Sequence, residues 1–221
     1  MQKNEVIDLR TYRGAGDETA GDEGSAAMEE LPPGTTLLYG QYKITGFLNS
    51  GGFGITYRAT DSLGRNVVVK ECYPSVMCFR AGKDVKVRSR QHADEFDDMV
   101  KNFVKEAHAL AAMDHKNIVR VHQVFEENET AYMAIDFIDG HDLLAVIETD
   151  PDRLGPREIE DLTKRTLRAI KYIHDRGMLH RDISPDNILL DEDDEPILID
   201  FGAAREQAKK AGRAMSRRKF V

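Results

Sequence analysis

The sequence is poor in the residue types that build disulfide frameworks and zinc sites. Cys72 and Cys78 are its only cysteines, and they form no C-x-x-C pair and stand beside no histidine cluster. We therefore predict two free thiols. Tryptophan is absent and aromatic residues make up 7% of the chain, so a core must be built mainly from aliphatic side chains and methionine. Such a core is compatible with a mixed α+β fold.

Three further absences limit the partners and the location that we expect. No stretch approaches the roughly 18 uninterrupted apolar residues of a membrane span, and the N-terminus lacks a basic region followed by an apolar one. The 39 acidic residues outnumber the 31 lysines and arginines, so there is no basic footprint for nucleic acid. We predict a cytoplasmic protein with no nucleic-acid partner and no membrane span.

The chain changes character along its length. Residues 1–36 are rich in Gly, Ala, Glu and Asp and show no sustained period, which predicts a disordered acidic tail. A short docked element around Val6, Ile7 and Leu9 is the alternative for this tail. Residues 205–221 are polar and basic, which predicts a flexible segment, with a partner-binding site as the alternative.

Between these ends the pattern predicts two lobes. Short β-type runs at 42–48, 55–61 and 67–71, and again at 118–125 and 131–138, predict five strands. Apolar residues at three- and four-residue spacing over 95–113 predict an amphipathic helix between the third and fourth strand. Together they form a first lobe, residues 37–140.

The second lobe, residues 141–204, is expected to begin with a helix. Gly155 and Pro156 open this helix and Gly177 ends it. Beyond it, the apolar runs 188–190 and 196–199 flank an acidic turn and predict a small hairpin.

A glycine-rich segment joins the first two predicted strands. Its glycines can bring backbone N–H groups against phosphate oxygens without a side chain in the way. An ordinary hairpin turn is the alternative. The candidate nucleotide-binding residues here are Leu48, Asn49, Ser50, Gly51, Gly52, Phe53 and Gly54.

One lysine and one glutamate fall on faces that the pattern otherwise predicts to be buried. Lys70 ends the apolar run of the third strand, and Glu106 shares the helix face of Phe103 and Leu110. Because unpaired buried charges are costly, we predict an ion pair that leaves Lys70 able to reach a phosphate. Two independent solvated residues are the alternative.

The strongest signal lies in the second lobe. His180, Arg181 and Asp182 are followed by Asn187, and Asp200 begins the sequence Asp-Phe-Gly. If the hairpin is correct, antiparallel pairing brings Asn187 and Asp200 to the same end. Two hard oxygen ligands with open coordination positions suit Mg²⁺ shared with nucleotide phosphates. Asp182 at the same mouth could orient a substrate hydroxyl and accept its proton.

These motifs, in this order, resemble the protein-kinase family, in which a glycine-rich loop, a strand lysine, a helix glutamate, an H-R-D…N loop and D-F-G follow one another. The resemblance covers residues 39–205. The sequence segments 51–57 and 115–120 are similar to the corresponding segments of bacterial serine/threonine kinases in particular. It implies an α+β, protein-kinase-like fold. The N-lobe would hold a five-stranded antiparallel sheet and one helix, followed by an incomplete, mainly helical C-lobe.

The resemblance also implies cofactors and roles. ATP and Mg²⁺ would be the cofactors, with Lys70 on the phosphates beside Glu106, Asp182 as the catalytic base, and Asn187 and Asp200 on the metal. The other nucleotide contacts that it implies are Ile135, Asp136 and Ile138 near the adenine and Asp142 near the ribose. The partner would be a protein substrate.

Three departures from the family pattern bear on activity. Asn49 stands where the loop usually has its first glycine, and Ser184 stands where serine/threonine kinases commonly carry a lysine that neutralises the transferring phosphoryl group. Residues 205–221 would be the start of the family's activation segment, and the sequence ends at Val221, before an A-P-E-like motif and the helices that normally follow. We therefore expect apolar surface that an oligomer or a partner covers, or a boundary within a longer protein.

Three functions compete. The first is ATP- and Mg-dependent phosphoryl transfer to serine or threonine hydroxyls of a protein, with the short chain active or not. The second is a catalytically silent, kinase-like module that binds nucleotide or a partner. The third is phosphorylation of a small molecule, which the His180-Arg181 pair and the glycine-rich loop disfavour.

Overall fold

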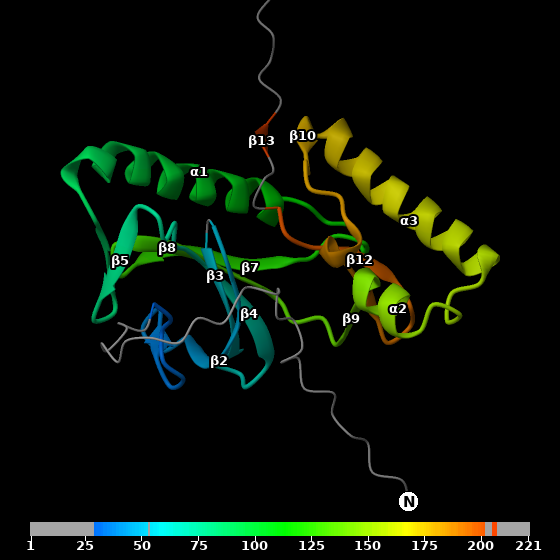
Figure 1. Ribbon diagram of the computed structural model, residues 1–221, viewed down its shortest axis with the longest axis horizontal. Helices are drawn as coiled ribbons and strands as arrows, with labels where there is room; N and C mark the ends of the chain where they lie inside the picture. Colours follow the sequence, from blue (N-terminus) through cyan, green and yellow to red (C-terminus); the bar gives the residue numbers. More distant parts are fainter. Residues whose placement is uncertain (1–28, 53, 202–204, 207–221) are drawn as a thin grey trace, which may run out of the picture. The chain divides into compact units, whose positions relative to one another are not determined.

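A computed structural model describes residues 29–52, 54–201 and 205–206 (Figure 1). Residues 1–28, 53, 202–204 and 207–221 lie outside these ranges, and so do the predictions that fall on them. The last residues of the predicted tail 1–36 are described, and among them Leu31 and Thr35 are buried. The chain divides into two compact units. Of the described residues, the first unit holds those from 29 to 100 together with 125–134, and the second holds 101–124 and those from 135 onward.

The first unit is built on an antiparallel sheet whose strand order is β1-β2-β3-β4-β8-β7. Residues of β7 and β8 at one end belong to the second unit. Alternating burial along β3 and β4 shows that the sheet turns one side into the core, as period-2 sequences require. The strands are β1 Thr36–Leu37, β2 Tyr42–Gly51, β3 Gly54–Asp61, β4 Asn66–Cys72, β7 Val121–Glu127 and β8 Thr130–Asp136.

The predicted five strands are all present in this sheet, and β1 adds a short sixth. Leu37 of β1 is buried, and its strand pairs with β2 through Leu37 and Tyr42. The core contains many aliphatic residues, as expected, but its largest fully buried side chains include Tyr57, Tyr73 and Tyr132. One buried cluster contains the aromatic residues Tyr42, Tyr57, Tyr73, Phe96, Phe125 and Tyr132, a grouping that composition alone cannot indicate.

A second hairpin follows β4 where the sequence predicted only a connection. Strands β5 (Cys78–Ala81) and β6 (Asp84–Val87) pair antiparallel, with Cys78 opposite Val87. The 3₁₀ helix η2 (Arg90–His92) then leads into helix α1 (Ala93–Ala111). Ser89 caps η2 by accepting a hydrogen bond from the Gln91 N–H. The helix starts and ends two residues before the predicted bounds.

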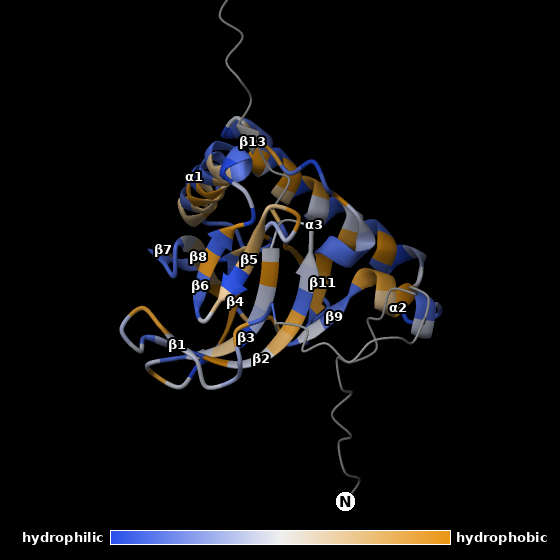
Figure 2. Ribbon diagram, turned by 60° about the vertical axis from the view of Figure 1, so that its left-hand side comes forward, coloured by the Kyte–Doolittle hydropathy of each residue, from blue (hydrophilic) through white to orange (hydrophobic). Residues whose placement is uncertain are grey.

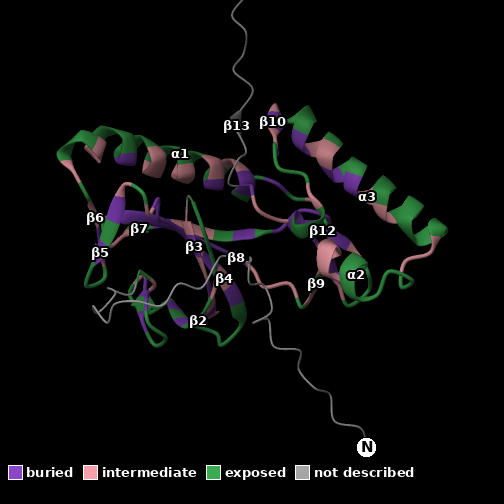
Figure 3. Ribbon diagram, viewed as in Figure 1, coloured by how far each residue is buried: buried purple, intermediate pink, exposed green. Residues whose placement is uncertain are grey.

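The second unit contains the predicted helix and hairpin. Helix α3 (Pro156–Asp175) has proline in its first turn, and its amphipathic sequence shows as alternating bands in Figure 2, with a buried side and an exposed side in Figure 3. Strand β11 (Ile188–Asp191) lies between β12 (Pro196–Leu198) and β9 (Gly140–Asp142). The remaining elements are α2 Leu143–Thr149, β10 Met178–Leu179, η3 Pro185–Asn187 and β13 Arg205–Glu206.

Glycine is required where β9 meets β11. A Cβ atom on Gly140 would overlap the backbone carbonyl oxygen of Leu190, so only glycine lets the two strands approach this closely. Within the described residues, no helix is long and apolar enough to cross a membrane.

Candidate active site

The side-chain amide of Asn187 holds the loop that begins at Asp182. Asn187 is 7% exposed, and its Nδ2 donates to the Asp182 main-chain oxygen at 3.1 Å and to Asp182 Oδ2 at 3.1 Å. A third acceptor, Ser184 Oγ, lies 3.2 Å away. Because Nδ2 faces these three oxygens, the amide oxygen Oδ1 faces another direction and is the atom that could bind a metal.

The β11–β12 hairpin sets Asn187 beside the beginning of the Asp-Phe-Gly sequence. Ile188 pairs with Leu198, and the Ile199 N–H donates to the Asn187 carbonyl oxygen at 3.0 Å. Asp200 is the next residue after Ile199. The hairpin was predicted, and it brings the two candidate metal ligands to one end. Carboxylate and amide oxygens are a donor set that fits Mg²⁺.

His180, two residues before Asp182, contacts the residues on either side of Asp200. It is buried, its Nε2 lies 2.9 Å from the Ile199 carbonyl oxygen, and its ring centroid is 4.4 Å from that of Phe201. Because a carbonyl oxygen only accepts, Nε2 carries a proton and donates. His180 therefore fixes the backbone that precedes Asp200.

The backbone at this site is held in an uncommon conformation at two places. Arg181 has φ 69° and Asp200 has φ 54°. The left-handed region costs a residue with a side chain about 1–2 kcal/mol, and such residues gather at functional sites where the surroundings impose the conformation. Arg181 is the neighbour of Asp182, and Asp200 is itself a candidate metal ligand.

The glycine-rich segment extends the β2–β3 hairpin. Strand β2 runs on to Gly51, which pairs with Gly54, and Asn49 and Ser50 lie within the strand and are exposed. A Cβ atom on Gly54 would lie 2.5 Å from the Glu71 carbonyl oxygen, so packing against β4 requires this glycine. A Cβ atom on Gly51 or Gly52 would meet no described atom within 4 Å.

Lys70 and Glu106 lie on the predicted elements, and both are half-buried. Lys70 is opposite Thr56 in the β3–β4 register of the first unit. Glu106 belongs to the part of α1 that falls in the second unit. Their ion pair stays a prediction.

The other expected nucleotide contacts lie on β8 and after it. Ile135 is buried and Ile138 is half-buried. The Asp136 carboxylate is engaged by His122 Nε2 at 2.7 Å. Asp142 caps α2, with Oδ1 accepting from the Ala145 N–H at 2.7 Å. These residues' contacts with nucleotide stay predictions.

Two contacts of these residues were not expected from the sequence. Ser184 was considered only as a missing lysine, and the structure makes its hydroxyl a partner of Asn187. The His122–Asp136 pair joins neighbouring strands, and no short motif marks it. Only the predicted pairing of these two strands, which can bring a histidine near a carboxylate, could have indicated such a contact.

The fold and the site define a protein kinase, and comparison with known families agrees. Residues 42–219 match the protein kinase domain family. The chain therefore belongs to the protein kinase family, which confirms the fold class and the phosphotransferase class expected from the motifs.

Particular relatives place the chain near bacterial serine/threonine kinases. It is 30% identical to the serine/threonine-protein kinase PknA of Mycobacterium tuberculosis over 76% of this chain and 36% of that protein. It is 28% identical to the serine/threonine-protein kinase pkn2 of Myxococcus xanthus over 79% of this chain and 19% of that protein. A solved structure described as PpkA-294 in its apo form matches with a TM-score of 0.72 and 34% identity, over 79% of this chain and 62% of that one. The chain thus spans only about a fifth to a third of these two curated relatives.

Proposed function

We propose that this chain carries the nucleotide- and metal-handling part of a serine/threonine kinase that transfers the γ-phosphoryl group of ATP to a protein hydroxyl with Mg²⁺. The observation that carries the proposal is the Asn187 amide. It holds the Asp182 carboxylate through Nδ2 and leaves Oδ1 beside the hairpin end where Asp200 follows. One side chain thereby links the candidate base to the candidate metal site.

The residues have separable tasks in this proposal. Asp182 Oδ2 accepts from Asn187, so its other oxygen can accept the proton of a substrate hydroxyl. Asn187 and Asp200 would hold Mg²⁺, which when bound neutralises charge on the phosphate oxygens. Gly51 and Gly52 leave room for backbone N–H groups to approach phosphate. Lys70 would contact the phosphates, and Ile135, Asp136 and Ile138 the adenine.

Phosphate transfer from labelled ATP·Mg²⁺ tests the proposal, with a basic test protein and the chain itself as acceptors. An Asp182→Ala variant should lose at least about 100-fold in rate, because general-base catalysis contributes about 10²–10⁴-fold, while nucleotide still raises its thermal midpoint. Nucleotide-dependent stabilisation of the parent chain without transfer would instead favour the catalytically silent module.

Partners and location follow the same proposal. A protein substrate, a cytoplasmic location and an oligomer or partner over the C-lobe stay predictions. The exposure of Ile159 and Leu167 on α3 supports such a covering partner, since large aliphatic side chains are more stable when buried. Size-exclusion chromatography with light scattering would reveal an oligomer.

A further inference from the structure

The first unit contains a buried ion pair that the proposed catalytic residues do not use. Glu71, on β4, is 1% exposed, and Arg80, on β5, is 9% exposed. Arg80 Nη2 lies 2.6 Å from Glu71 Oε2. Removing two charges from water is costly and is tolerated only where further hydrogen bonds satisfy both groups.

Those further hydrogen bonds come from the strands on either side of β4. Tyr57, on β3, donates its hydroxyl to Glu71 Oε2 at 2.7 Å, and Tyr132, on β8, donates to Glu71 Oε1 at 2.7 Å. In the sheet order, β4 stands between β3 and β8. Both oxygens of one carboxylate are thus held by the two neighbouring strands, and the β5 arginine adds a third attachment.

Arg80 is satisfied equally well. Its Nε donates to the Glu29 carbonyl oxygen at 2.5 Å and its Nη1 to the Lys83 carbonyl oxygen at 3.1 Å. Its guanidinium carbon also lies 4.9 Å from the Tyr73 ring centroid. Burial lowers the pKa of Arg80, but the hydrogen bond and the charge of Glu71 outweigh it and the pKa is raised, so the guanidinium stays charged.

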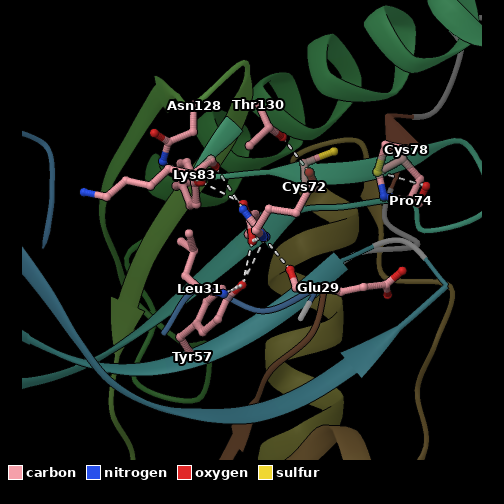
Figure 4. A network of polar contacts seen from close by, with 12 residues as sticks. Glu29, Leu31, Tyr57, Cys72, Pro74, Cys78, Lys83, Asn128 and Thr130 are labelled. Atoms are coloured by element: carbon pink, nitrogen blue, oxygen red, sulfur yellow. Dashed lines mark hydrogen bonds and ion pairs between the residues drawn. The ribbon is translucent and has the colours of Figure 1, made fainter. Parts of the chain in front are cut away.

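The network also fastens the segment 29–31, which precedes the sheet. The Leu31 N–H donates to the Tyr57 hydroxyl oxygen at 3.1 Å, and the Leu31 side chain is buried. Figure 4 shows Leu31 beside Tyr57, with Glu29 reached by another dashed line from the same cluster. The hydroxyl of Tyr57, a residue of β3, therefore contacts both this segment and the buried ion pair.

Glu71 is the immediate neighbour of Lys70, and this gives the network a consequence for the site. Successive side chains of a strand point to opposite faces. Tyr57 pairs with Val69, and Lys70 pairs with Thr56, so the network grips one face of β4 and Lys70 lies on the other. A strand held on one face by two neighbours and an arginine has little freedom to rotate or slide.

We propose that Glu71 and Arg80, with Tyr57 and Tyr132, are positioning residues for Lys70, and that segment 29–31 is the strap that completes their network. The inference rests on the proposed function, in which Lys70 contacts nucleotide phosphate. Loosening the strap or removing one tyrosine hydroxyl displaces the Lys70 amine from its working position without removing a group from the site.

The test measures Lys70 directly. An acyl phosphate of ATP acylates a lysine that lies at the phosphates, because the amine forms an amide with the acyl group and the nucleotide phosphate leaves. Peptide mass spectrometry of the full chain gives the rate of Lys70 acylation. Tyr57→Phe and Tyr132→Phe each remove one oxygen atom, and Leu31→Ala weakens the strap. The control is Ile44→Val, which trims a buried residue of β2 that makes no hydrogen bond to the network.

We expect the two tyrosine variants to acylate Lys70 at least fivefold more slowly than the parent chain, with a similar rise in KM for ATP. Leu31→Ala should change both in the same direction. Ile44→Val should lower the thermal midpoint and leave the acylation rate unchanged. All rates are taken at a temperature where each variant is folded.

Three results would overturn the inference or part of it. Parent-like acylation in both tyrosine variants, despite lowered thermal midpoints, would make the network purely structural. Parent-like acylation in Leu31→Ala alone would show that segment 29–31 has no part in positioning Lys70. A parent chain that acylates no Lys70 would show that the lysine is not at the phosphates. A parent chain that acylates Lys70 and transfers no phosphate would refute the proposed kinase activity, while the variant rates would still decide the positioning role.

Discussion

Asn187 donates to both the main-chain oxygen and the carboxylate of Asp182, each at 3.1 Å. The residue expected to bind metal therefore also orients the residue expected to act as base. A substitution at 187 can separate these two tasks, because aspartate keeps an oxygen ligand but cannot donate a hydrogen bond when ionised.

We expect Asn187→Asp to retain most of its affinity for nucleotide with Mg²⁺ and to lose at least about tenfold in kcat, since a misplaced base costs part of the 10²–10⁴-fold contribution of general-base catalysis. Asn187→Ala should lose both affinity and kcat. Steady-state kinetics at several Mg²⁺ concentrations would separate the two effects. Equal kcat in Asn187→Asp and the parent chain would show that the hydrogen bonds to Asp182 do not matter for transfer.

Two glycines of the phosphate-loop candidate should respond differently to alanine. Gly54→Ala places a Cβ atom 2.5 Å from the Glu71 carbonyl oxygen, and this backbone overlap should cost about 1–3 kcal/mol of the free energy of unfolding. Gly52→Ala meets no described atom within 4 Å and should leave that free energy nearly unchanged, while KM for ATP rises if the loop lies against phosphate. Urea unfolding and kinetics on the same two variants form a matched pair. A stable Gly54→Ala protein would contradict the packing account.

His115 should make the second unit sensitive to mild acid. Burial, helped by the charges of Lys116 and Arg176, lowers the pKa of His115 below 6.5, and its Nδ1 accepts from the Asn117 N–H at 3.1 Å. Because the folded pKa is the lower one, this contribution to stability is complete above pH 6.5 and is lost as pH falls towards the folded pKa. NMR titration of the His115 ring should give a midpoint below 6.5.

An asparagine in place of His115 supplies a side-chain oxygen that can accept the same hydrogen bond and does not titrate. The His115→Asn variant should therefore lose less stability than the parent chain between pH 7 and pH 5. A parallel loss in both proteins would mean that other groups cause the acid sensitivity.

Glu195 accepts hydrogen bonds from three side chains, and at neutral pH these should stabilise the hairpin turn against unfolding. Arg165 Nη1 lies 2.6 Å and Lys116 Nζ 3.0 Å from its Oε1, and Asn117 Nδ2 donates to Oε2 at 3.2 Å. Burial raises the pKa of Glu195, but the hydrogen bonds from these three residues outweigh it, and the pKa is lowered from 4.5. The stability that results is present above pH 4.5 and is lost as pH falls through the lower folded pKa.

Glu195→Gln should destabilise the protein at pH 7 and have a smaller effect at pH 3. Denaturant unfolding at both pH values checks this, with Glu192→Gln in the same acidic turn as the control. If Glu195→Gln destabilises the protein equally at both pH values, the effect comes from altered packing and not from the lost charge.

Much of the fold could be predicted because its signals are local. The positions of Lys70 on a strand, of the loop from Asp182 to Asn187 and of the β11–β12 hairpin each follow from residues close together in the chain. Strand alternation and turn residues indicate them directly. The β5–β6 hairpin was missed because its strands are four residues each, too short for a period to stand out. Helix α2 was missed for a similar reason, since it has seven residues.

The buried network was beyond the reach of sequence patterns for a different reason. Glu71 ends the predicted strand 67–71, and Arg80 falls in what the sequence predicted to be a connection. A charged residue at either kind of position normally indicates contact with solvent. Only the return of β5 against the sheet, and of residues 29–31 beside Tyr57, brings their partners together. Contacts across 26 and 61 residues, such as Leu31 with Tyr57 and Glu71 with Tyr132, have no signature in a single sequence.

The close approach of Tyr57, Tyr132, Arg80 and Glu71 also limits how this domain can be recombined. A chimera that takes β4 from this chain and the β5–β6 hairpin from a kinase without an arginine at the position of Arg80 would bury the Glu71 carboxylate without its partner. Breaking such a buried pair costs about 3–5 kcal/mol. Crossover points for domain grafting should therefore fall before residue 29 or after β8. Strand β4, which carries Lys70, and the β5–β6 hairpin would then always come from the same parent protein.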